Sequence, residues 1–181
     1  AAMMDLKQQG KIRAIGVCNA TSDQMKQYWD AGQLDSDQEK YSMLDRGIEQ
    51  DQLPFCRENN VAVLAYSPLS KGLLTGKCGP EREFNEGDQR RTEERFSVEN
   101  RKRVAEMLEK FKPVADGHNI TLAQLVTAWT FHQPGLTHVL VGARNAKQGR
   151  ENAAAGEVEL SEDELKTIDG AIEEYAGAVA K

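Results

Sequence analysis

The chain has 181 residues and a net charge of -6, with 39% hydrophobic and 29% charged residues. This length allows one globular domain with a proper core. The negative charge argues against nucleic-acid binding, no apolar run reaches the ~18 residues of a membrane span, and the sequence shows no secretory signal pattern.

The cysteines and histidines indicate neither disulfides nor a metal site. The three cysteines form no CxxC pair, which is typical of reduced thiols and predicts a cytoplasmic protein. His118, His132 and His138 lack the spacing to Cys or carboxylates that metal ligands require. We therefore expect no bound metal.

The first half of the chain alternates predicted helices and strands. Residues 1–9 favour a helix that ends at Gly10, and residues 12–17 form a β-branched run typical of a strand buried on both faces. The capping box Thr21–Gln24 opens a helix to about residue 31. Residues 35–41 should be the next strand, although their charges make it a weak one.

The alternation continues to the end. Helix is predicted over 48–59, 98–112 and 122–133, strand over 61–67 and 138–141, and a long charged loop over 76–97. Asn145 opens a further helix, and the capping box Ser161–Glu164 opens a last one to about residue 176. Such alternation predicts a parallel sheet. Four strand-helix units are either a complete open sheet or half of an eight-unit barrel, and periodicity leaves both open.

Two segments carry the chemistry. One is Ala65-Tyr66-Ser67-Pro68-Leu69-Ser70-Lys71-Gly72, and the other is Val139-Leu140-Val141-Gly142-Ala143-Arg144-Asn145 with Gln148, Glu151 and Asn152 behind it. Each is a buried strand that runs into a loop suited to a nucleotide phosphate. At the second, a helix N-terminus favours an anion and Arg144 can fork onto a phosphate.

These segments, with residues 11–19 and 38–46, resemble strands five to eight of the aldo-keto reductase family. The resemblance covers nearly the whole chain. It implies one incomplete domain over 1–181: a helix at 1–10, then the second half (strands 5–8) of a (β/α)₈ barrel over 11–181, including the 76–97 loop. It also implies that the family's catalytic Asp, Tyr, Lys and His lie outside this chain.

The resemblance assigns a cofactor site to twelve residues and no catalytic residue. They are Asn19, Gln38, Tyr66, Ser67, Pro68, Leu69, Lys71, Gly142, Arg144, Gln148, Glu151 and Asn152. It implies that Tyr66 stacks on the nicotinamide, that Asn19 and Gln38 hold the carboxamide, and that Glu151 and Asn152 hold the adenosine end. A bond from Arg144 to a 2′-phosphate would favour NADP over NAD, and Gln148, where many members have a second Arg, softens that preference.

The expected function is therefore NADPH-dependent reduction of aldehyde or ketone carbonyls, carried out by a complete enzyme of which this chain is the cofactor-binding C-terminal half. A non-catalytic NADP-binding subunit and an inert truncated fragment are the alternatives. Half a barrel exposes strand edges. We therefore expect this chain to pair with a missing N-terminal half or to self-associate.

Overall fold

The computed structural model describes residues 2–175, so Ala1 and the predicted end of the last helix near residue 176 lie outside the described residues. Its elements in chain order are α1 (Ala2–Gln8), β1 (Gly16–Cys18), α2 (Ser22–Ala31), β2 (Ser36–Lys40), η1 (Gly47–Gln50), α3 (Gln52–Glu58), β3 (Ala62–Tyr66), η2 (Ser70–Thr75), η3 (Gln89–Arg91), η4 (Glu94–Phe96), α4 (Val98–Gly117), α5 (Leu122–Phe131), β4 (His138–Leu140), α6 (Ala146–Ala154), η5 (Ala155–Glu157) and α7 (Glu162–Tyr175).

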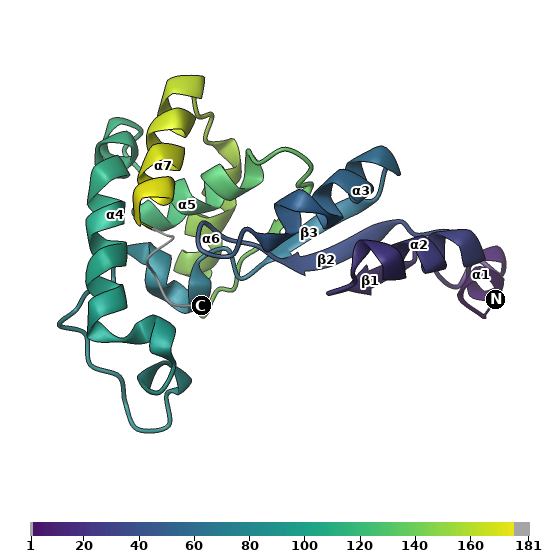
Figure 1. Cartoon of the computed structure of the whole chain (residues 1–181), viewed down its shortest axis with the longest axis horizontal. Coiled ribbons are helices and arrows are strands. Elements are labelled where there is room, and N and C mark those ends of the chain that lie inside the picture. Colours follow the sequence, from purple (N-terminus) through teal and green to yellow (C-terminus); the bar gives the residue numbers. More distant parts are fainter. Residues whose placement is uncertain (1, 176–181) are drawn as a thin grey trace.

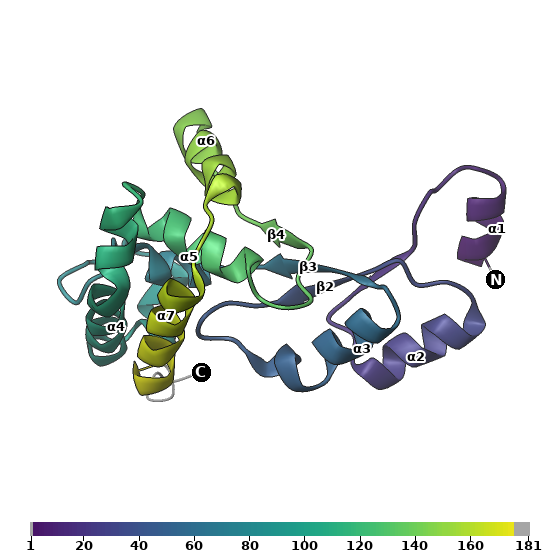
Figure 2. The same ribbon diagram turned by 90° about the horizontal axis from the view of Figure 1, so that it is seen from above.

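The four strands form one parallel sheet in the order β1-β2-β3-β4, which confirms the predicted alternation. Helices α2 and α3 run along one face of the sheet, while α4, α5 and α7 gather at the other end of the molecule (Figures 1 and 2). Within residues 2–175 the sheet does not close, and β1 and β4 are its two edges. Unpaired edges of this kind offer backbone groups to further strands.

Capping residues set the helix boundaries where the sequence predicts them. Thr21 and Thr121 each form a capping box with the Gln three residues later, and Asn145 accepts from the backbone of Gln148. The backbone N–H of Gly10 (φ +70°) donates to the Lys7 carbonyl and ends α1. Each side-chain cap stabilises its helix by about 1 kcal/mol.

Three predicted boundaries are wrong. The strand predicted over 12–17 begins only at Gly16, and it is not buried on both faces, since Gly16 and Cys18 are exposed and Val17 is half-buried. Strand β4, which was also predicted to be buried, has His138 and Leu140 exposed. The helix predicted over 48–59 breaks at Asp51 (φ -135°, ψ -67°) into η1 and α3. Helix α4 continues through Pro113 to Gly117, because Phe111 and Ala115 extend its buried stripe past the proline.

The segment of residues 76–97 is more structured than a plain loop. It contains the short turns η3 and η4. The buried Arg101 on α4 donates to the carbonyls of Gly79 (2.6 Å), Arg82 (2.7 Å) and Phe96 (2.9 Å). These charge-assisted bonds fold the segment back onto α4 and fix its path over the carboxyl end of the sheet.

Candidate functional site

A cavity of about 470 Å³ lies where β3 and β4 end, between the loops that follow these strands and helix α6. Ligands in α/β barrels bind at this end of the strands. Nine of the twelve predicted cofactor residues line it: Ser67, Pro68, Leu69, Lys71, Gly142, Arg144, Gln148, Glu151 and Asn152. The cavity thus brings together two loops that are about 75 residues apart in the sequence.

The loop after β3 has an unusual backbone. Ser67 (φ +60°), Ser70 (φ +44°) and Lys71 (φ +53°) adopt left-handed conformations that cost L-residues about 1–3 kcal/mol each. Such strain is concentrated at ligand-binding sites, where it holds backbone groups in a fixed orientation. Here it turns the chain sharply along the cavity wall.

Side-chain hydrogen bonds fix the conformation of the loop after β4 and of the start of α6. The backbone N–H of Arg144 donates to Gln148 Oε1 (2.8 Å), and Asn152 Nδ2 donates to the Gly142 carbonyl (3.2 Å). Thr121 Oγ1 donates to Glu151 Oε1 (2.9 Å). These bonds shape the entry of α6, whose N-terminus faces the cavity and favours an anion.

Three cavity residues come from the 76–97 segment and were missed from the sequence: Lys77, Arg82 and Arg90. With Lys71 and Arg144 they give the lining five cations against the single carboxylate of Glu151. Arg90 also pairs with Asp88 (2.6 Å), and this hydrogen bond lowers the pKa of Asp88 to about 2. Six acidic residues outnumber five basic ones within residues 76–97, so the composition of the segment gave no signal for them.

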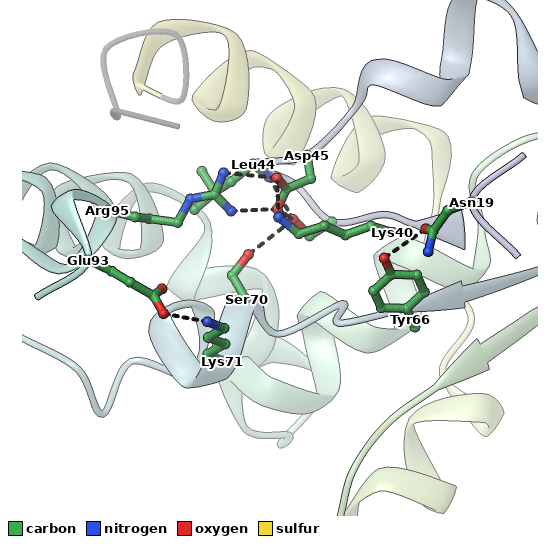
Figure 3. A network of polar contacts seen from close by, with 10 residues as sticks. Asn19, Lys40, Leu44, Asp45, Tyr66, Ser70, Lys71, Glu93 and Arg95 are labelled. Carbon is green, nitrogen blue, oxygen red and sulfur yellow. Dashed lines mark hydrogen bonds and ion pairs between the residues drawn. The ribbon is translucent and has the colours of Figure 1, made fainter. Parts of the chain in front are cut away.

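The other three predicted residues lie close together: Asn19 directly follows β1, Tyr66 ends β3, and Gln38 is in the middle of β2 beside Cys18. Tyr66 Oη donates to Asn19 Oδ1 (2.8 Å), while the amides of Asn19 and Gln38 reach Cys18 Sγ at 3.4 and 3.8 Å. Because Tyr66 directly precedes Ser67, this cluster adjoins the cavity of about 470 Å³. Figure 3 shows the Tyr66–Asn19 contact beside Lys40.

Asp45 is the centre of a polar hub at the rim of the site (Figure 3). It accepts two bonds from Arg95 (2.6 and 2.8 Å), one from Lys40 (2.9 Å) and one from Ser42 (3.0 Å). Burial acts to raise the pKa of Asp45, but the bonds from Arg95 and Lys40 outweigh it and hold the pKa at about 2. The hub therefore ties η4 of the 76–97 segment to the end of β2.

Comparison with known proteins decides the family. The Aldo/keto reductase family pattern matches residues 1–173. The chain belongs to this family. This aldo-keto reductase chain is 41% identical over 162 residues to the NADH-specific methylglyoxal reductase of Escherichia coli K12, and 33% identical over 162 residues to the Schizosaccharomyces pombe aldo-keto reductase yakc [NADP(+)].

Solved aldo-keto reductases share its fold. The glycerol dehydrogenase AKR11B4 of Gluconobacter oxydans superposes with a TM-score of 0.90 at 28% identity, over 99% of this chain and 54% of that one. The E. coli and S. pombe relatives cover 90% and 88% of this chain, which matches 49% and 48% of theirs. The aldo-keto reductase chain thus spans about half the length of its relatives and matches part of their (β/α)₈ barrel.

The described residues show neither a cluster of metal ligands nor a membrane-spanning helix. Among residues 2–175, no group of three or more His, Cys, Asp or Glu side chains gathers as a metal site would require. None of the helices in this aldo-keto reductase chain that the structure describes is both long and apolar enough to cross a bilayer.

Proposed function

We propose that this chain is the cofactor-binding, C-terminal half of an aldo-keto reductase and that its cavity holds NADPH for the reduction of aldehyde or ketone carbonyls. The observation that carries the proposal is the cavity itself. Two loops at the carboxyl ends of β3 and β4, together with helix α6, supply nine of the predicted residues, and five cations line a space of about 470 Å³.

The assignment to strands five to eight rests on the order of the motifs. The segments that resemble those strands coincide with β1, β2, β3 and β4 in turn, and the two segments suited to phosphate follow β3 and β4. Phosphate sites in (β/α)₈ barrels frequently lie after strands seven and eight. A helix, α1, precedes β1, as the second half of such a barrel requires.

The residues present fit a dinucleotide phosphate. Lys71, Lys77, Arg82, Arg90 and Arg144 would hold the phosphates, and the N-terminus of α6 adds donors. Tyr66, Asn19 and Gln38 would hold the nicotinamide end. The cofactor supplies the hydride, and the chain orients it and neutralises its charge. The catalytic acid belongs to the other half of the barrel, so this chain alone should not turn over carbonyl substrates.

The choice between NADP and NAD is open to a direct test at Arg144. Replacing Arg144 with Ala should weaken NADPH binding by about tenfold to a hundredfold, the effect of losing one charge-assisted hydrogen bond. NADH binding should change by less than about threefold. Fluorescence titration of the isolated chain with both cofactors measures the two losses.

Arg150→Ala is the matched control, because this exposed arginine lies on α6, shortly after Arg144 in the chain, but outside the cavity lining. It should leave both affinities unchanged. Equal losses for NADPH and NADH in Arg144→Ala would remove the 2′-phosphate argument. A wild-type chain that binds neither cofactor would contradict the cavity's assignment.

A further inference from the structure

The most anomalous side chains of the sheet are two acids on the core face of β2. Asp37 is 0% exposed and Glu39 is 5% exposed. Both carboxyl oxygens of Asp37 and Oε1 of Glu39 are buried, and no N–H or O–H group of the described residues donates a hydrogen bond to them. Burying unpaired ionised carboxylates is costly, and such groups keep a proton instead.

The surroundings of the pair offer no positive charge. Residues two apart on a strand share a face, so both carboxyls point toward the layer of α2 and α3. Asp37 lies beside Val17 of β1 and Val63 of β3, and Glu39 lies beside Ala65. Within residues 2–175, neither acid takes part in an ion pair with Lys, Arg or His.

In the described part of the chain, the titratable groups that interact electrostatically with the pair are acids or a neutral thiol, and none of them is basic. Asp37 and Glu39 act on each other, and the thiol of Cys56 on α3 is the further group coupled to both. Burial first, and then the two acids, raise the pKa of Cys56 to about 12, so this thiol stays neutral. Two carboxyls in one apolar site cannot both ionise readily, and they titrate as a pair.

We propose that Asp37 and Glu39 share a proton in the folded chain, and that its loss loosens β2, so that the fold weakens as the pH rises. Strand β2 is the middle of the connection between β1 and β3, and its Gln38 belongs to the predicted nicotinamide end of the site. Proton uptake by the core is therefore coupled to the order of the sheet, and this coupling can be tested without cofactor.

The direction of the effect follows from linkage. Burial and the neighbouring Glu39 raise the pKa of Asp37 from 3.8 to about 7, so between these values the folded chain holds a proton that the unfolded chain has released. The contribution of this proton to stability is present in full below pH 3.8, and it is lost as the pH rises toward about 7. Asp45, whose pKa is lowered, contributes in the opposite direction and only in the acid range.

The test is urea denaturation of the full chain, without cofactor, at pH 5, 6, 7 and 8. The unfolding equilibrium constant of the wild type should rise by about tenfold per pH unit from pH 5 to pH 7. In the double variant Asp37→Val, Glu39→Gln the rise should shrink to less than about twofold per unit, because no buried carboxyl remains to lose a proton. Asp30→Asn, at an exposed position on α2, should follow the wild type.

Glu39→Gln alone keeps the shape of the side chain and removes the acidic neighbour of Asp37, so the rise in the unfolding constant should end at a lower pH than in the wild type. Hydrogen exchange of the β2 amides should accelerate in the wild type at pH 8 beyond the intrinsic rate increase, and should not do so in the double variant. A wild type whose unfolding constant is flat from pH 5 to pH 7 would overturn the proposal. A double variant that loses stability as steeply as the wild type would also overturn it.

Discussion

Replacing Asp45 with Ala is expected to destabilise the chain by about 3 kcal/mol and to free the 76–97 segment from the sheet. Asp45 and Arg95 have side chains that are only 15% and 14% exposed, and they form a two-point contact. Removing one member of a largely buried pair leaves the other charge without compensation. Lys40, which is 44% exposed, adds little to this loss.

The consequence for the cavity can be measured separately from stability. The freed segment carries Lys77, Arg82 and Arg90 on the cavity wall, so hydrogen exchange over residues 76–97 should accelerate at least tenfold in Asp45→Ala. Glu162→Ala, which removes a partner of an exposed ion pair on α7, is the control and should change neither readout. A loss below about 1 kcal/mol with unchanged exchange would show that the Asp45 hub does not anchor the segment.

Joining this chain to the first half of a related enzyme should produce the largest functional gain. When it is fused to the first half of the E. coli methylglyoxal reductase, methylglyoxal-dependent oxidation of NADPH or NADH should rise at least about a hundredfold above either half alone. The reason is that, on the proposed assignment, the general acid and the cofactor cavity lie in different halves and act only when both are in one barrel. Loss of cofactor absorbance at 340 nm measures the rate.

Controls for this experiment are the same fusion without methylglyoxal and the fusion carrying Arg144→Ala. The first should stay at the blank rate, and the second should need more NADPH to reach the same rate. If the isolated chain reduced methylglyoxal as fast as the fusion did, the assignment of acid and cofactor cavity to different halves would be refuted.

The oligomeric state of the isolated chain can be measured by light scattering. We expect pairing across the exposed strand edges rather than a stable 20 kDa monomer.

The sequence predicts the parts of this fold that depend on local chemistry. The capping residues Thr21, Thr121 and Asn145 set helix starts correctly because a cap acts within three residues. The weak strand over 35–41 forms despite its charges, since pairing with β1 and β3 overrides the composition of β2.

Features set by distant contacts were not predictable in the same way. The exposure of β1 depends on which elements cover its faces, and α4 continues past Pro113 because Phe111 and Ala115 are buried in the core. Arg82 and Arg90 reach the cavity only because Arg101 and Asp45 hold the 76–97 segment in place. No local pattern carries that information.

The central claim is that the loops after β3 and β4 form a nucleotide phosphate site. Its most direct test is a titration of the isotope-labelled chain with adenosine 2′,5′-bisphosphate, followed by amide NMR shifts. This ligand needs only the residues that line the cavity of this chain. The account predicts saturable shifts at Leu69, Gly142, Gln148 and Asn152. Unmoved amides at all four positions, at ligand concentrations that saturate an intact aldo-keto reductase, would contradict it.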